Sequence, residues 1–199
     1  MLWVVAEGII YYSMFDKEKH VVKASDYKYK EYYISCDYGT QNATVFGLWG
    51  KTFDDKHVMI KEYYYSGRDT GVQKTDLDFS NDLKEFTKDY KIKYVVLDPS
   101  AAYFKAQLIR DKFKVFPVKN SVLDGIRLVA SLLGQYKILF DESCNEIFKE
   151  FSSYVWDYEA CKKGEDKVVK DHDHSMDQVR YFGTTVIKNK GKDKKTLKR

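Results

Sequence analysis

The sequence lacks the features that mark secreted, membrane-spanning and zinc-knuckle proteins. It contains only three cysteines, an odd number without C-x-x-C spacing, which argues against a disulfide framework and against a zinc knuckle. No stretch approaches the roughly 18 consecutive apolar residues of a membrane span, and no basic region precedes the apolar residues near the start. We therefore expect a soluble protein of a reducing cytoplasm, with no membrane partner.

The composition predicts one globular domain. The chain has 199 residues, of which 44% are hydrophobic and 16% aromatic, enough for a proper core. The formal net charge of +4 is concentrated at one end, because residues 188–199 contain six Lys, one Arg and one Asp. The rest is about neutral to slightly acidic. This basic tail can touch phosphates without reading sequence, or it is simply a solvated terminus.

The pattern of the chain divides it into three parts. Residues 1–30 hold a short apolar run and a charged stretch with no clear period, and we expect them to form a connecting segment that could include a hairpin. Residues 31–187 form the domain itself, and residues 188–199 form the basic tail. No internal repeat is present.

An antiparallel start followed by α/β alternation predicts the fold class. Strands are expected at 33–37, 43–49 and 57–65, with turn residues between them that favour a meander. A loop at 66–71 and a helix at 80–90 follow. The remaining predicted elements are strands at 94–98, 114–118 and 137–140, helices at 101–112, 121–133 and 142–151, and a candidate strand pair at 153–158 and 167–170. We predict an α/β fold with a central mixed sheet flanked by helices.

Two aspartates close two of these strands. Asp37 ends an alternating run before Gly39, and Asp98 ends a continuous apolar run before Pro99. A right-handed crossover would lay the Asp98 strand parallel to the Asp37 strand and beside it. Both carboxylates would then emerge at the same end of the sheet.

A third acidic group lies on a predicted helix near the end of the chain. Met176 and Val179 recur at helical spacing as an apolar face. Asp173, His174 and Asp177 share the neighbouring face. Adjacent carboxylates repel one another, and a hard divalent cation is the usual way to hold them ionised together. The three regions therefore predict a site for Mg²⁺ or Mn²⁺, in which two ions could support phosphodiester hydrolysis.

Each of these residues also has a simpler interpretation. An Asp before Gly or Pro is a common turn element, and Asp173 and Asp177 could be solvated helix charges.

The segment from Gly47 to Thr52 ends in Gly-Lys-Thr like a phosphate-binding loop, but its glycine spacing is wrong and it leads into a strand. A hairpin turn explains it better, and we assign no ATP site.

With these residues in place, most of the chain resembles the C-terminal nuclease domain of the large terminase subunit of tailed bacteriophages, which has a ribonuclease H-like fold. The stretch that includes Asp173, His174 and Asp177 is the most specific match. The matching stretches are 34–39, 66–68, 73–75, 97–100, 119–121, 124–126 and 173–181.

The resemblance implies roles for individual residues. It implies metal ligation by Asp37, Asp98 and Asp177, with His174 beside them, as well as DNA contacts. Asp173, one residue before His174 on the predicted helix, is a substitute candidate for the place of His174. The residues expected to contact DNA are Lys119, Arg68 and Lys74. Gln178 stands where the family often has Ala, a departure that we expect to leave the chemistry untouched.

The leading hypothesis is an endonuclease that cleaves double-stranded DNA concatemers with little sequence preference during viral genome packaging. The resemblance implies a terminase ATPase domain in the same polypeptide ahead of this chain, and a small terminase subunit and a capsid portal as partners. It places the protein in the cytoplasm of an infected bacterium. Two alternatives stay open: another ribonuclease H-like nuclease, of the junction resolvase or integrase type, or a non-catalytic DNA-binding or assembly module with the same fold.

Overall fold

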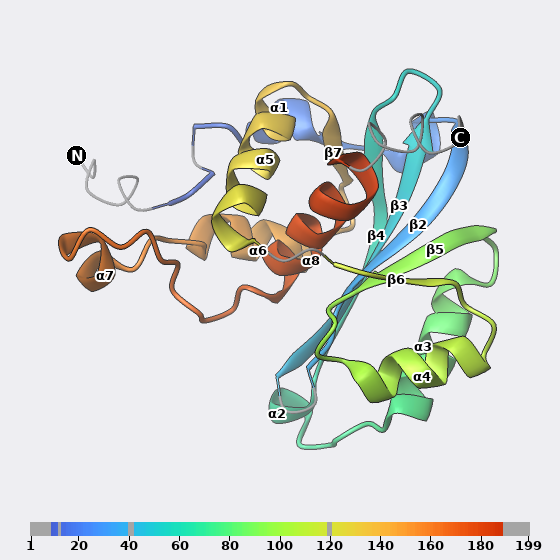
Figure 1. Cartoon of the computed structure of the whole chain (residues 1–199). Helices are drawn as coiled ribbons and strands as arrows, with labels where there is room; N and C mark the ends of the chain where they lie inside the picture. The colour runs from blue at the N-terminus through green and yellow to red at the C-terminus, as the bar shows by residue number, and fades with distance from the viewer. Residues whose placement is uncertain (1–8, 12, 40–41, 119–120, 189–199) are drawn as a thin grey trace, which may run out of the picture.

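The computed structural model describes residues 9–11, 13–39, 42–118 and 121–188. Within these residues a seven-stranded mixed sheet runs through the molecule in the order β1-β7-β4-β3-β2-β5-β6 (Figure 1). The strands are β1 (Val21–Val22), β2 (Tyr29–Asp37), β3 (Ala43–Thr52), β4 (His57–Ser66), β5 (Ile92–Leu97), β6 (Val115–Pro117) and β7 (Ile138–Asp141).

The centre of the sheet has the predicted arrangement. β2, β3 and β4 form an antiparallel meander, with Ile34 opposite Leu48 and Phe46 opposite Tyr63. β5 lies parallel to β2 and beside it, in a register that pairs Cys36 with Leu97. Asp37 and Asp98, the residues next in the chain, are therefore brought to the same end of neighbouring strands.

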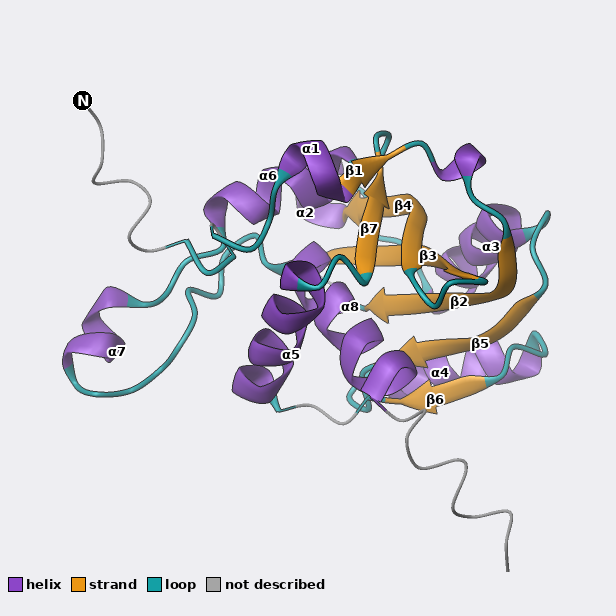
Figure 2. Ribbon diagram, turned by 90° about the horizontal axis from the view of Figure 1, so that it is seen from above, coloured by secondary structure: helices purple, strands orange, loops and turns teal. Residues whose placement is uncertain are grey.

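Helices cover both faces of the sheet. α5, α6 and α8 lie on one face, whereas α3 and α4 lie on the other (Figures 1 and 2). Each helix within the described residues is too short or too polar to cross a bilayer. The helices are α1 (Lys17–His20), α2 (Gly67–Thr70), α3 (Asp76–Thr87), α4 (Ala102–Arg110), α5 (Val122–Gly134), α6 (Asn145–Ser153), α7 (Tyr158–Lys162) and α8 (His174–Phe182), which continues as a π-helical turn (Gly183–Ile187).

The alternation of side chains along β2 divides the core into two layers. Ile34 and Cys36 are fully buried against α3 and α4, whereas Tyr33 is buried in the layer that contains α5, α6 and α8. Successive strand residues point to opposite faces, so Ser35 and Asp37 face α8 as Tyr33 does. The period-two pattern of β2 thus aims Asp37 at the helix that carries His174 and Asp177.

The N-terminal segment takes part in the fold more than its sequence predicts. β1 adds a strand to the edge of the sheet, parallel to β7, with Val21 opposite Phe140. Ile10 and Tyr11 are buried in the core, and the imidazole of His20 is also buried. The hairpin expected within residues 1–30 is not formed in their described part. A two-residue strand is too short to show a periodic pattern, which is why it could not be predicted.

Side-chain caps move two other boundaries. The predicted loop at 66–71 contains the helical turn α2, because the Ser66 hydroxyl accepts the N–H of Asp69. α3 begins at Asp76 rather than at 80, because Thr75 and Asp78 form a capping box.

The predicted strand pair at 153–158 and 167–170 is reduced to a single bridge between Trp156 and Val168, with α7 between them. This segment projects away from the sheet (Figure 1).

Candidate active site

Asp37, at the end of β2, is joined to His174, the first residue of α8. His174 Nδ1 lies 2.8 Å from Asp37 Oδ2, so the imidazole N–H donates to the carboxylate. This bond raises the pKa of His174 above its usual value, against the opposing effect of burial. Burial raises the pKa of Asp37, the bond from His174 opposes that rise, and the carboxylates of Asp177 and Asp173 add to it.

The N-terminal turn of α8 brings two further carboxylates to the same place. Asp173 and Asp177 are only 6% and 8% exposed, and both are paired with cations. Lys170 Nζ lies 2.7 Å from Asp173 Oδ2 and 3.2 Å from Asp177 Oδ2. Arg180 Nη2 lies 2.8 Å from Asp177 Oδ1. Such pairing is what a buried carboxylate requires if it is to stay charged.

Asp98 lies beyond the end of β5 and has a turn role. Its Oδ1 accepts the N–H of Ser100 at 2.8 Å, and its carbonyl oxygen accepts the N–H of Ala101. Burial raises the pKa of Tyr181, on α8, and the charges of Asp37, Asp177 and Asp98 add to that rise. The structure therefore shows the turn role of Asp98, and its role as a metal ligand stays a prediction.

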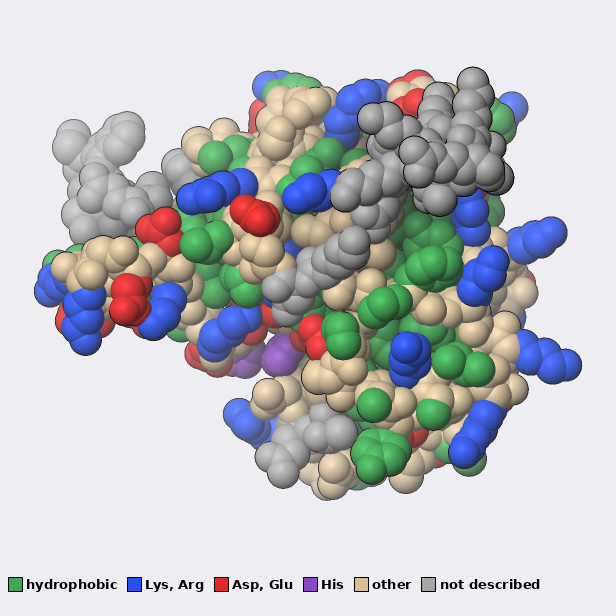
Figure 3. All heavy atoms as spheres, viewed as in Figure 1, with side chains coloured by type: hydrophobic (Ala, Val, Ile, Leu, Met, Phe, Trp, Pro, Cys, Tyr) green, Lys and Arg blue, Asp and Glu red, His purple; other side chains and the backbone are tan. Residues whose placement is uncertain are grey.

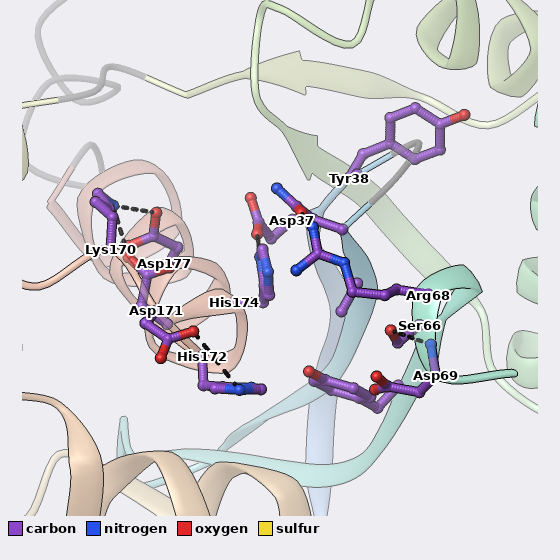
Figure 4. A pocket seen from close by; sticks show the side chains of 15 residues that line it. Asp37, Tyr38, Ser66, Arg68, Asp69, Lys170, Asp171, His172, His174 and Asp177 are labelled. Carbon is purple, nitrogen blue, oxygen red and sulfur yellow. Dashed lines mark hydrogen bonds and ion pairs between the residues drawn. The ribbon is translucent and has the colours of Figure 1, made fainter. Parts of the chain in front are cut away.

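A hollow of about 480 Å³ contains most of these groups. Asp37, Asp173, His174 and Asp177 line it, whereas Asp98 is not among its lining residues. In the space-filling view, histidine and acidic side chains meet beside this hollow, between the two halves of the molecule (Figure 3). The close-up shows Asp37 and His174 together in the middle, with Lys170 and Asp177 on one side and Arg68 on the other (Figure 4).

The three residues predicted to contact DNA differ in where they lie relative to the hollow. Arg68, on α2, is exposed, lines the hollow and extends its side chain toward Asp37 (Figure 4). Its Nη2 donates to Asn42 Oδ1 at 3.3 Å. Lys74 does not line the hollow; its Nζ lies 2.6 Å from Asp82 Oδ2 and packs over the ring of Tyr65. Lys119 lies outside the described residues. Of the two lysine and arginine candidates that the structure describes, Arg68 is the one placed at the site.

Gln178 has a role that the sequence analysis missed. Its side chain is fully buried, and its Oε1 accepts a hydrogen bond from the hydroxyl of Ser35 on β2. The Ser35 hydroxyl in turn accepts from Trp49 Nε1 at 2.9 Å. Gly47 allows this approach, because a Cβ there would collide with the Gln178 amide. The residue that we expected to be incidental docks α8 onto the sheet.

Two glutamates, Glu62, which is partly buried, and Glu150, which is buried, cap the helices that support the site. Glu62, on β4, accepts the N–H groups of Glu146 and Ile147 at the start of α6. Glu150, on α6, accepts the N–H of Met176 at 3.0 Å in the first turn of α8. Burial raises the pKa of Glu62 to about 7 and that of Glu150 to about 8. These contacts connect β4 through α6 to α8. No local sequence motif predicts them, because each joins residues that are far apart in the chain.

In the part of the chain that the structure describes, no three or more His, Cys, Asp and Glu side chains form a group that is ready to hold a metal ion. The geometry explains this finding, because Asp37 is turned to His174 while Asp173 and Asp177 are turned to Lys170 and Arg180. The donor set nevertheless has the right chemistry. Carboxylate oxygens are the ligands that hard divalent cations prefer, and an imidazole suits several transition metals.

Comparison with known proteins relates the chain to one class of phage protein. No protein-family model matches it. The large terminase subunit of Escherichia phage T5 is 28% identical over 134 residues, which cover 64% of this chain and 28% of that protein. The large terminase of a thermophilic bacteriophage, solved in complex with ADP, is 50% identical and has a TM-score of 0.87 over 94% of this chain and 46% of its own. The chain is a homologue of phage large terminase subunits. It spans less than half the length of either relative.

The fold is that of the terminase nuclease domain. The nuclease of the large terminase of a second thermophilic phage, G20c, solved with bound magnesium, has a TM-score of 0.65 at 17% identity, over 90% of this chain and 98% of its own. That neighbour is a nuclease domain over nearly its whole length, and its likeness to this chain shows a shared fold. The resemblance drawn from the sequence is confirmed, and so is the ribonuclease H-like α/β fold class.

Proposed function

We propose that this chain is the metal-dependent endonuclease domain of a large terminase subunit, and that it cleaves double-stranded DNA concatemers with little sequence preference during viral genome packaging. The observation that carries the proposal is the convergence of Asp37, His174 and Asp177 in one hollow, on a chain homologous to large terminases. The bound magnesium of the G20c nuclease, which shares the fold, supports a divalent cation here.

Asp37, Asp98 and Asp177 are the proposed metal ligands. Two Mg²⁺ or Mn²⁺ ions would lie between these carboxylates, with Asp173 as a substitute ligand. Two such ions, when bound, supply a Lewis acid that activates water and stabilises the leaving oxygen of a phosphodiester. The strand ends and α8 contribute by holding the carboxylates on a rigid framework, since ligands placed on regular elements are held more precisely than ligands on loops.

His174 serves this site through its two ring nitrogens. Nδ1–H donates to Asp37 Oδ2 and thereby fixes the orientation of that carboxylate. The remaining nitrogen, Nε2, is the atom that can bind an ion or position a water. Because the bond to Asp37 raises the pKa of His174, the ring keeps a second proton to higher pH than a free histidine, and ligation of an ion requires its loss.

DNA contacts are proposed on the wall opposite α8. The guanidinium of Arg68 lies across the hollow from His174 (Figure 4), where it can bind a backbone phosphate. Lys119 remains a candidate, whereas the ion pair of Lys74 with Asp82 makes Lys74 a weaker one. The other proposed partners are an ATPase domain in the same polypeptide, the small terminase subunit and the capsid portal. The proposed location is the cytoplasm of the infected bacterium.

Nicking of supercoiled plasmid tests the proposal. With Mn²⁺, wild-type protein should nick, and Asp37→Asn and Asp177→Asn should each nick at least about 100-fold more slowly because a metal ligand is lost. Asp89→Asn, an equal charge change on an exposed residue outside the hollow, should match the wild type. Equal nicking by all four proteins, or none by any of them over a range of metal concentrations, would contradict the proposal. Calorimetry distinguishes the nuclease from a non-catalytic module with the same fold, because such a module should show no binding of a divalent ion that depends on Asp37.

A further inference from the structure

Asp177 has two cationic partners that differ in how readily they can leave. Arg180 contacts Oδ1 and has a side chain only 2% exposed. Lys170 contacts Oδ2, and its side chain is 55% exposed. Arg180 is also enclosed by α5, where its Cγ packs against Gly125, whereas Lys170 lies in the irregular segment that precedes α8. One partner of Asp177 is therefore fixed, and the other is able to move into water.

We propose that Lys170 is an internal counter-cation of the metal site, whose ammonium group must be displaced from Asp173 and Asp177 when a divalent cation binds. The inference rests on the proposed function, because it assumes that Asp177 is a metal ligand. The ammonium group contacts Oδ2 of Asp173 and Oδ2 of Asp177 at the same time. A divalent cation held by Asp177, or by Asp173 as the substitute ligand, would have to compete with Lys170 for these carboxylates.

The physical reason for such a residue is the burial of the two carboxylates. Asp173 and Asp177 are almost wholly buried, and neighbouring buried carboxylates repel one another unless a cation lies between them. Lys170 supplies that charge from within the chain, so that folding does not depend on a bound ion. A strongly hydrated ammonium on a flexible stem can also return to water at small cost. The arrangement makes Lys170 an exchangeable cation.

The same argument predicts a weaker affinity for metal than the carboxylates alone would give. An incoming ion must compete with the ion pairs of Lys170, and the free energy of those pairs is subtracted from the free energy of metal binding. Removal of the ammonium group should therefore tighten metal binding and destabilise the protein in the absence of metal. A lysine that merely covered the surface would produce neither change.

Titration calorimetry with Mn²⁺ tests this inference on wild-type protein, Lys170→Met, Lys170→Arg and Lys167→Met. The last is a matched control, because Lys167 is an exposed lysine of the same segment whose ion pair is with Glu165. We expect Lys170→Met to bind Mn²⁺ about tenfold more tightly than the wild type. Lys170→Arg, which keeps the charge, and Lys167→Met should remain near the wild-type value. Lys170→Gln provides the same comparison if Lys170→Met folds poorly.

Thermal unfolding provides a second readout that does not depend on activity. In a chelator, Lys170→Met should melt below the wild type, and Mn²⁺ should raise its Tm by more than it raises the wild-type Tm. Equal Mn²⁺ affinities, or weaker binding by Lys170→Met, overturn the inference and leave the proposed metal site intact. If Lys170→Met binds Mn²⁺ and the wild type does not, the inference is supported most strongly. No binding by either protein overturns both the inference and the metal site.

Discussion

Arg180 Nη2 lies 2.8 Å from Asp177 Oδ1, one helical turn away, and the two side chains are 2% and 11% exposed. Removing Arg180 takes away the buried one of the two cations that contact Asp177 and leaves only the more exposed Lys170 to compensate a buried carboxylate. Arg180→Met should therefore lower the free energy of unfolding by about 3 kcal/mol, as measured by urea denaturation.

Arg127 offers a matched control for this prediction. Its Nη2 lies 4.0 Å from Asp166, and both side chains are largely exposed. Exposed pairs contribute little, so Arg127→Met should change the free energy of unfolding by less than about 0.5 kcal/mol. Equal losses in the two variants would show that the buried pair does not stabilise the α8 region as described.

Gly125 on α5 allows the close approach of α8. A Cβ at Gly125 would collide with Cγ and Cδ of Arg180, whereas a Cβ at Gly134, the last residue of the same helix, would meet nothing within 4 Å. Gly125→Ala should cost about 1–2 kcal/mol because the packed core cannot absorb the added methyl group. Gly134→Ala should be neutral or stabilising by up to about 1 kcal/mol. Urea denaturation of both variants measures the difference, and a loss at Gly134 as large as that at Gly125 would refute the packing argument.

Asp98→Asn separates the turn role of Asp98 from its proposed metal role. An Asn side-chain oxygen can accept the N–H of Ser100 as the carboxylate does, so the free energy of unfolding should stay within about 0.5 kcal/mol of the wild type. Plasmid nicking should fall at least about 100-fold if a ligand is lost. Unchanged nicking would leave Asp98 as a turn residue alone.

Glu150 should make stability depend on pH. Burial raises its pKa to about 8 from an ordinary value of 4.5, so between these values the folded protein holds a proton that the unfolded chain releases. The folded state then binds more protons, and its stability falls as the pH rises through this window. Between pH 5 and 8, wild-type protein should lose on the order of 2 kcal/mol relative to Glu150→Gln, which cannot titrate.

Urea denaturation of both proteins at pH 5, 6.5 and 8 checks this prediction. The comparison removes the contribution of groups that titrate alike in the two proteins, Glu62 among them. A difference that stays constant over the three pH values, or that shifts in favour of the wild type as the pH rises, would show that Glu150 is ionised throughout.

The features that the sequence predicted well depend on local patterns. The alternation along β2 and the turn residues around Gly39 and Gly50 predicted the meander. Helical spacing placed His174 and Asp177 on one face of α8. The parallel pairing of β2 with β5, expected from the intervening helix, put Asp37 and Asp98 at the same end of the sheet. The roles of these aspartates in binding metal remain predictions.

The features that the sequence concealed depend on partners far along the chain. Ser35 and Gln178 are 143 residues apart, so nothing near Gln178 shows that its amide meets a strand. Lys170 looks like one more lysine of a charged segment until α8 brings Asp173 and Asp177 together. The burial of Glu150 likewise could not be predicted from its neighbours in the sequence, because the N–H that it accepts belongs to another helix. Contacts of this kind become visible only after the chain has folded.

β2 has a further property that follows from its two buried faces. Ile34 and Cys36 complete one apolar layer, while Ser35 and Asp37 face α8 from the other. Adding or deleting a single residue in this strand would exchange the faces of everything beyond the change, driving the carboxylate into the apolar layer and a hydrophobic side chain toward His174. A change in the length of β2 between Tyr33 and Asp37 would therefore keep this arrangement only in steps of two, or where a bulge absorbs the extra residue.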